Sequence, residues 1–272
     1  MKILALKVYI DSIQGYREGV PKLLDILSEL GIAASIFFGM GTEDDGSVMS
    51  RIFREEKEIV ASAPGIIRDA HRRGHDCGIY GWNPREWQLR LEKMKDTTLE
   101  ADIKRSVEYF ARRTGNRPAG FAAPGFRATY ISLRIQDDVR FKYCSDTFGH
   151  YPFLPKISWK TFATPQIPAT LPPLEIMLQK ISEAVVRTRL ENLSDALPDG
   201  LSVLPMNAVV ASVPEIFPPL YEFVARCHNA GVRFLTLAQV AKNLAATPLP
   251  QCEIISAKAF GMPREVALQS TD

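Results

Sequence analysis

The chain has 272 residues with 33 basic and 31 acidic side chains, which gives a formal net charge of +2. This balance argues against nucleic acid as a partner and against a polybasic membrane contact. No apolar run reaches the roughly 18 residues of a membrane-spanning helix, and the N-terminus lacks the layout of a signal peptide, so we expect a cytoplasmic protein without a transmembrane segment.

The first residues predict a strand that ends at a ligand site. In residues 6–21, LKVYIDSIQGYREGVP, apolar residues alternate with Lys7, Tyr9 and Asp11, and a helix is expected to start at Pro21. Ligands of parallel α/β domains bind at the C-terminal ends of the strands, where Tyr9 and Asp11 stand.

The rest of the chain alternates between apolar strands and amphipathic helices. Strands are expected over 32–38, 77–80, 120–124, 141–146, 201–207 and 232–237. Helices are expected over 21–30, 64–73, 99–113, 176–193, 214–229 and 237–244. The helix over 99–113 has Thr97 and Glu100 in the spacing of a capping box.

Three segments are expected to be loops. Residues 39–60 predict a loop with a short helix, a candidate lid, and residues 81–88 predict a loop over a strand end. Residues 147–175, rich in proline and aromatic residues, predict a long ordered loop with a buried piece at 166–169.

About seven strands, most followed by a helix, predict one α/β domain that is a barrel rather than an open sheet. We place this barrel at residues 1–245 and a peripheral tail at 246–272. The apolar tail residues Ile254, Ile255 and Phe260 either cover an interface in a homo-oligomer or pack on their own barrel. No glycine-rich motif follows the first strand, so no nucleotide cofactor is expected.

The four cysteines, Cys77, Cys144, Cys227 and Cys252, are too widely spaced for a zinc knuckle. Cys144 is expected to be a small half-buried apolar residue, with a reactive thiol as the alternative.

Several motifs in chain order resemble the NodB-type polysaccharide deacetylase superfamily. They are LKVYIDSIQGYREGVPKLLDIL, GHDCGIYGWNPREWQ, AAPGFRA and VLPMNAVV. SDTFGHYPFLP and ATPQIPATLPP are similar to the branch that deformylates undecaprenyl-phosphate-linked 4-formamido-arabinose. The resemblance covers roughly residues 3–244 and implies a distorted (β/α) barrel of about seven strands.

The resemblance implies metal-assisted hydrolysis of an N-acyl group. The family uses an Asp-x-Asp pair, two histidines four residues apart, an arginine and a general-acid histidine. The matching positions in this sequence hold Tyr9 and Asp11, Tyr80 and Pro84, Arg127, and Asn207. Because one carboxylate remains and both imidazoles are missing, we expect no catalytic metal and no other cofactor.

His71 and His75 have the spacing of a metal-binding pair, but they precede a strand and therefore lie at the opposite end of the barrel. We expect solvated histidines at a helix end.

The candidate catalytic residues are therefore Asp11, Tyr9, Arg127 and Tyr80, and the candidate ligand-binding residues are Trp82, Asn83, Asp146 and Asn207. For Asp11 the alternative is a structural salt bridge to Arg127 or Arg17. A metal held by Asp11, Asp146 and substrate oxygens is the least favoured arrangement.

Two functions fit these residues. The first is a metal-independent enzyme that acts on an amide- or carbonyl-bearing small molecule, sugar-like or a secondary metabolite. Acid–base chemistry would drive carbon–nitrogen hydrolysis or proton transfer. The alternative is a catalytically silent pseudoenzyme that binds a glycan or lipid-linked sugar, or that partners an active enzyme.

Overall fold

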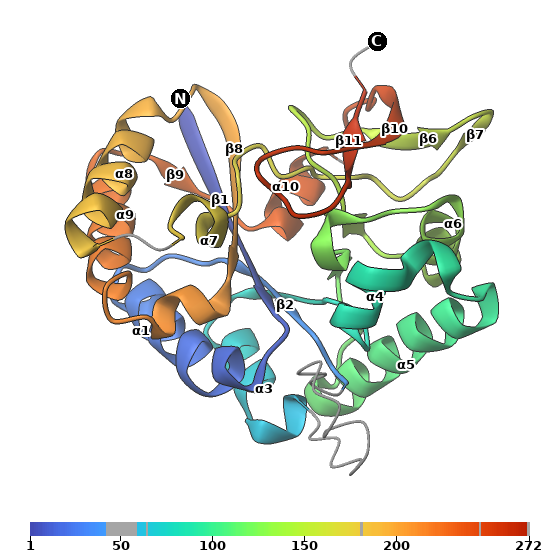
Figure 1. The fold of residues 1–272 in the computed structure, drawn as a ribbon, viewed down its shortest axis with the longest axis horizontal. Coiled ribbons are helices and arrows are strands. Elements are labelled where there is room, and N and C mark those ends of the chain that lie inside the picture. Colours follow the sequence, from blue (N-terminus) through green and yellow to red (C-terminus); the bar gives the residue numbers. More distant parts are fainter. Residues whose placement is uncertain (42–58, 64, 180–181, 245, 271–272) are drawn as a thin grey trace.

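A curled sheet of parallel strands forms the centre of the protein, and helices surround it (Figure 1). The computed structural model describes residues 1–272 except 42–58, 64, 180–181, 245 and 271–272. The strand order is β5 (Tyr143–Cys144), β4 (Gly120–Phe121), β3 (Asp76–Ile79), β2 (Ser35–Phe38), β1 (Lys2–Ile10), β8 (Gly200–Asn207), and β9 (Arg233–Phe234) also pairs with β1. The predicted α/β fold with about seven barrel strands is confirmed, as a half-barrel.

Nine α-helices are described in the structure outside the gaps given above. They are α1 (Val20–Glu29), α3 (Ile66–Arg72), α4 (Pro84–Arg90), α5 (Asp96–Thr114), α6 (Tyr130–Val139), α7 (Leu174–Met177), α8 (Glu183–Ala196), α9 (Phe217–Asn229) and α10 (Leu237–Leu244). Helix α1 follows the prediction: Pro21 lies in its first turn, Leu23 and Leu27 are buried on one face, and Gly31 follows its end with φ +65°. None of the described helices is long and apolar enough to cross a membrane.

Four expectations about helices are wrong. Residues 81–88 are not all loop, because Asn83 caps α4. The single helix expected over 176–193 is two helices, α7 and α8. Helix α5 begins at Asp96 without a side-chain cap, so Thr97 forms no capping box. Helix α6, capped by Thr129, was not expected at all. Most of the expected lid over 39–60 lies outside the described residues.

A second, smaller sheet has the order β11 (Val266–Gln269), β10 (Gln251–Ala257), β6 (Leu154–Ile157), β7 (Lys160–Thr161). Its strands come from the expected loop over 147–175 and from the expected tail, which lie together at the upper right of Figure 1. The predicted buried piece at 166–169 is confirmed. The tail is joined to the barrel, because the N–H of Phe148 donates to Ala267 O (3.0 Å) and Ala267 is buried. The domain boundary at residue 245 stays a prediction.

Polar side chains link the N-terminal ends of the strands to α10. Asp76 Oδ2 accepts hydrogen bonds from Ser35 Oγ (2.7 Å), Tyr143 OH (2.5 Å) and the N–H of Ala238 (3.0 Å). We call these four residues the Asp76 cluster. Since its members come from β2, β3, β5 and α10, the cluster joins that helix to the N-terminal ends of three strands.

Candidate functional site

The loops that follow β1 and β8 meet at the C-terminal edge of the sheet. The two strands pair in parallel, with Tyr9 opposite Asn207. A Cβ on Gly19 would lie 2.0 Å from Ala208 O, so only glycine allows the turn after β1 to approach the turn after β8 so closely. This approach places Asp11 next to Asn207.

Asp11 is held by side-chain amides rather than by a cation. Its Oδ1 accepts a hydrogen bond from Asn207 Nδ2 (2.8 Å), and Gln88 also hydrogen-bonds to the carboxyl group. Burial nevertheless raises the pKa of Asp11. The alternative of a salt bridge is wrong for the described residues, because Arg127 pairs with Glu92 and Arg17 donates to Ser62 O.

Tyr9 and Tyr80 form a buried stack beside Asp11. Their ring centroids are 5.0 Å apart with an interplanar angle of 14°. The Tyr80 hydroxyl accepts a hydrogen bond from the N–H of Gly125 (3.2 Å), and the Tyr9 hydroxyl donates to Glu175 Oε1. Burial raises the pKa of both phenols well above their usual value, so both stay neutral.

Glu175, in α7, is a member of this site that the sequence reasoning missed. Its Oε1 accepts from Tyr9, and its Oε2 accepts from the N–H of Asn207 (3.0 Å). Burial raises its pKa, and the charge of Asp11 raises it further. We call Tyr9, Asp11, Glu175 and Asn207 the carboxylate cluster.

Arg127 lies at the border of this site without reaching the carboxylate cluster. Its guanidinium donates to Gln88 O and Glu92, so it holds α4 to the loop after β4. Gln88 therefore lies between Arg127 and Asp11: its backbone oxygen accepts from Arg127, and its side chain hydrogen-bonds to Asp11. The catalytic role of Arg127 stays a prediction.

Trp82 and Asn83 have structural contacts in the same loop. Trp82 is buried against Tyr109, with the Arg105 guanidinium 3.6 Å from its ring centroid. Asn83 Oδ1 accepts from the N–H of Glu86 (3.3 Å) and so caps α4. Ligand binding by both residues stays a prediction.

Asp146 lies inside the half-barrel, fully buried. It accepts hydrogen bonds from the N–H of Ala123 (2.7 Å) and from Gln166 Nε2 (2.9 Å). Burial raises its pKa to about 6, against the opposing charge of Lys7. The described contacts of Asp146 are therefore to its own chain, and its ligand binding stays a prediction.

Lys7 is the cation that faces Asp146. Its Nζ donates to Ser145 O (2.5 Å) and lies 4.2 Å from the centroid of the Phe126 ring. Burial lowers the pKa of Lys7 to about 7, although Asp146 and Glu175 oppose the shift. Lys7 and Asp146 are thus two buried ionisable groups that act on one another, and we call them the buried charged layer.

The residues at the family's metal positions do not fit a metal ion. Tyr80 is a neutral phenol that already accepts a backbone hydrogen bond, and Pro84 has no donor atom. Within the described residues, no three His, Cys, Asp or Glu side chains stand close enough to share a metal. The arrangement of Asp11 and Asp146 around a metal therefore has no third protein ligand.

His75 differs from its prediction, because it is buried rather than solvated. Its Nδ1 accepts from the N–H of Ala34 (3.1 Å), and burial lowers its pKa to about 4.

Cys144 is fully buried, and burial raises the pKa of its thiol well above the usual value, so the alternative of a reactive thiol is wrong.

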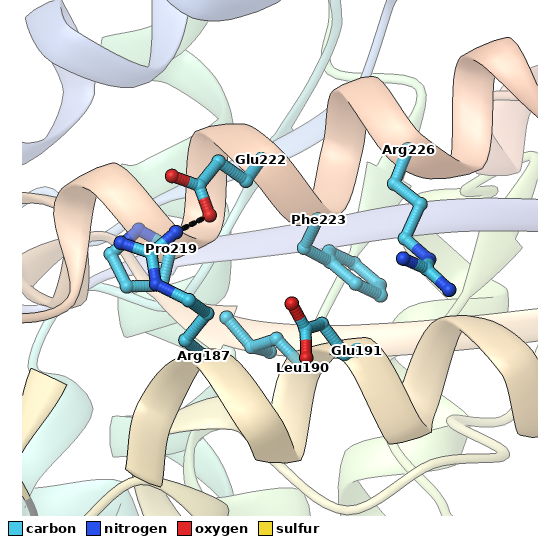
Figure 2. A pocket seen from close by; sticks show the side chains of 7 residues that line it. All are labelled: Arg187, Leu190, Glu191, Pro219, Glu222, Phe223 and Arg226. Atoms are coloured by element: carbon cyan, nitrogen blue, oxygen red, sulfur yellow. Dashed lines mark ion pairs between the residues drawn. The ribbon is translucent and has the colours of Figure 1, made fainter. Parts of the chain in front are cut away.

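Two hollows on the described surface lie away from these residues. Figure 2 shows a groove of about 190 Å³ between α8 and α9, where Arg187 pairs with Glu222. A larger hollow of about 540 Å³ lies at the N-terminal ends of β4 and β5 beside α10, lined by Lys142 and Lys242. Neither hollow lies at the C-terminal ends of the strands, where ligands of parallel α/β domains bind. The carboxylate cluster does, and it is therefore the candidate site.

Comparisons with known proteins agree with the motifs. The family model described as polysaccharide deacetylase matches residues 9–144. A Shewanella sediminis (strain HAW-EB3) protein, named probable 4-deoxy-4-formamido-L-arabinose-phosphoundecaprenol deformylase ArnD, is 28% identical over 237 residues, covering 77% of this chain and 76% of its own.

Two solved structures show a similar fold. A protein from Mycobacterium smegmatis, described as a polysaccharide deacetylase, has a TM-score of 0.73 at 17% identity and covers 95% of this chain and 96% of its own. A probable polysaccharide deacetylase from Pseudomonas aeruginosa PAO1 has a TM-score of 0.69 at 17% identity, covering 90% and 92%.

Proposed function

The chain belongs to the polysaccharide deacetylase family, and from this premise we propose that it is a metal-independent enzyme on a deacetylase- and deformylase-like scaffold. It acts on an amide- or carbonyl-bearing, sugar-like small molecule, and the reaction is acid–base hydrolysis of a carbon–nitrogen bond. The same acid–base groups would also support a proton transfer on a carbonyl-bearing metabolite, which is the second reaction that the proposal includes.

One observation carries the proposal: ionisable groups remain at the strand ends where the metal-binding residues are missing. Asp11 keeps a carboxylate whose hydrogen-bond donors are neutral amides. Its raised pKa makes it a stronger base than an ordinary surface aspartate. Such a group activates water without a metal ion if the amide is bound beside it.

The substrate class comes from the relatives. The Shewanella sediminis protein is named a deformylase of a 4-formamido-arabinose lipid, so a formamido sugar is the first substrate to test. We also propose that the protein is cytoplasmic, that it has no nucleic-acid partner and that it forms a homo-oligomer. The exposed side chains of Ile255 and Phe260, at 46% and 40%, support an interface between copies of the chain.

The test combines metal analysis with turnover. Purified protein is analysed by inductively coupled plasma mass spectrometry, and formate release from a soluble 4-formamido-arabinose phosphate analogue is measured with and without a chelator. We expect far less than one zinc per chain and an unchanged rate in the chelator. Stoichiometric zinc together with chelator-sensitive turnover would contradict metal independence.

The alternative function is a pseudoenzyme that binds a glycan or lipid-linked sugar, or that partners an active enzyme. The observation that favours it is the use of Asn207 in place of the general-acid histidine. Its Nδ2 donates to Asp11 and its Oδ1 accepts from the N–H of Val209 (3.0 Å), so its amide is committed to structure. Calorimetric binding of the analogue without any formate release would support this alternative.

A further inference from the structure

Asn207 holds two carboxylates at once. Its side-chain Nδ2 donates to Asp11 Oδ1 (2.8 Å), and its main-chain N–H donates to Glu175 Oε2 (3.0 Å). Both donors belong to one residue, so the two carboxylates are neighbours, and the charge of Asp11 acts on Glu175. They come from opposite parts of the chain, the end of β1 and the short helix α7.

Asp11 and Glu175 have no described salt bridge to a cation. Arg127, the arginine that borders the site, pairs with Glu92. Lys7 is the cation whose charge acts on Glu175, and its Nζ is bound to Ser145 O. Two neighbouring carboxylates without a salt bridge to a cation resist ionising together, so one proton stays with the pair.

The contacts of the two carboxylates differ. Asp11 accepts from the amides of Asn207 and Gln88, which stabilise its ionised form. Burial and the charge of Asp11 raise the pKa of Glu175 and favour a proton on it, although the hydrogen bond from the Tyr9 hydroxyl opposes this shift. Tyr9, Tyr80 and Lys7 are the other titratable groups that face the pair.

We propose that Asp11 and Glu175 are a catalytic carboxylate pair, Asp11 as the base and Glu175 as the acid, which together hydrolyse the amide of the substrate. This inference rests on the proposed function and names the machinery that replaces the metal. Asn207 is the positioning residue, because it acts through both carboxylates.

The step balances with one water molecule. Asp11 takes a proton from water while the water oxygen forms a bond to the amide carbon, and Glu175 gives its proton to the carbonyl oxygen. In the second step the carbon–nitrogen bond breaks, Asp11 gives its proton to the nitrogen, and Glu175 takes a proton back from an intermediate hydroxyl. The products are a carboxylic acid and an amine, and the pair again holds one proton.

The kinetic test uses Glu175→Gln, Asp11→Asn and the matched control Glu191→Gln, an exposed glutamate of α8. The probe is the soluble 4-formamido-arabinose phosphate analogue, and the readout is formate release as a function of pH. We expect kcat to fall about 100-fold or more in both site variants, with KM changed little. Asp11→Asn should lose the acidic limb of the pH profile and Glu175→Gln the alkaline limb, while Glu191→Gln matches the unmodified chain.

A second measurement separates this inference from the proposed function. The carboxyl carbon of Glu175 is titrated by ¹³C NMR in the unmodified chain and in Asp11→Asn, after circular dichroism has shown that each variant is folded. The pairing requires the pKa of Glu175 to fall in Asp11→Asn. A protein that releases formate while Glu175→Gln keeps its full rate overturns the pair but leaves the function standing. A protein that releases no formate overturns the function, and then an unchanged pKa of Glu175 overturns the pairing as well.

Discussion

Carboxylates stand at both ends of the same half-barrel, and their surroundings differ. In the Asp76 cluster, one oxygen accepts three hydrogen bonds, from a serine, a tyrosine and a backbone N–H of three separate elements. In the carboxylate cluster, Asp11 and Glu175 share a single asparagine, which donates to Asp11 from its side chain and to Glu175 from its main chain. The first arrangement joins separate elements of the fold, whereas the second brings two carboxylates together, which is the basis of the proposed proton transfer.

The difference teaches how to separate scaffold from site where both contain buried carboxylates. Burial raises the pKa of Asp76 as well as that of Asp11, so the direction of the shift does not distinguish them. The geometry does: one oxygen of Asp76 accepts from three elements, whereas Asp11 and Glu175 are two carboxylates that share one residue. Barrels commonly use their N-terminal end for stability and their C-terminal end for chemistry.

The largest effect is expected for Asp76→Ala. Removal of the carboxylate leaves Ser35, Tyr143 and Ala238 without this acceptor, so the free energy of unfolding should fall by about 3 kcal/mol. Asp11→Ala leaves mainly the partly exposed amide of Asn207 without a partner, and we expect about 1 kcal/mol or less. Urea denaturation of both variants measures the contrast, and equal losses at the two ends would remove it.

The sequence predicts those residues of the candidate site that lie at the C-terminal ends of strands. Tyr9, Asp11, Tyr80 and Asn207 were expected at strand ends, and parallel pairing does bring them to one edge. Alternating apolar residues fix where a strand ends, and the parallel order then fixes the neighbours. The site residues that lie on strand ends were therefore open to prediction.

Glu175 was not open to the same reasoning. It lies 166 residues from Tyr9, at the end of a proline-rich segment without helical or strand periodicity. An acidic residue directly after TLPPL was the only local signal. Likewise, β10 pairs with β6 about a hundred residues away, so the order of the tail depends on a partner that no local pattern reveals.

The buried charged layer between the two ends gives the next prediction. With the pKa of Lys7 lowered to about 7, the unfolded chain binds more protons than the folded chain between pH 7 and 10.5. The free energy of unfolding should therefore rise with pH across this window, by at most about 1.4 kcal/mol per pH unit. Lys7→Met should remove this rise.

Asp146 acts in the opposite direction at lower pH. Its pKa is raised to about 6, so its contribution to stability is present below pH 3.8 and is lost as pH rises through 6. Urea denaturation at several pH values in the unmodified chain and in Lys7→Met checks both signs. A rise that persists unchanged in Lys7→Met would show that another group causes it.

The smallest effect is expected for Tyr9→Phe, which tests whether the Tyr9 hydroxyl serves the carboxylate cluster or only fills space. The variant keeps the stack on Tyr80 and removes one donor from Glu175, so the free energy of unfolding should change by about 1 kcal/mol or less. Because Glu175 then loses an oriented partner, kcat for formate release should fall by about tenfold, which corresponds to about 1.4 kcal/mol. Tyr80→Phe is the matched control: its hydroxyl accepts from the N–H of Gly125 and contacts no carboxylate through a described hydrogen bond, so its kcat should change less. If the two variants lose the same activity, the contact between Tyr9 and Glu175 has no special part in the reaction, and the buried stack alone explains both tyrosines.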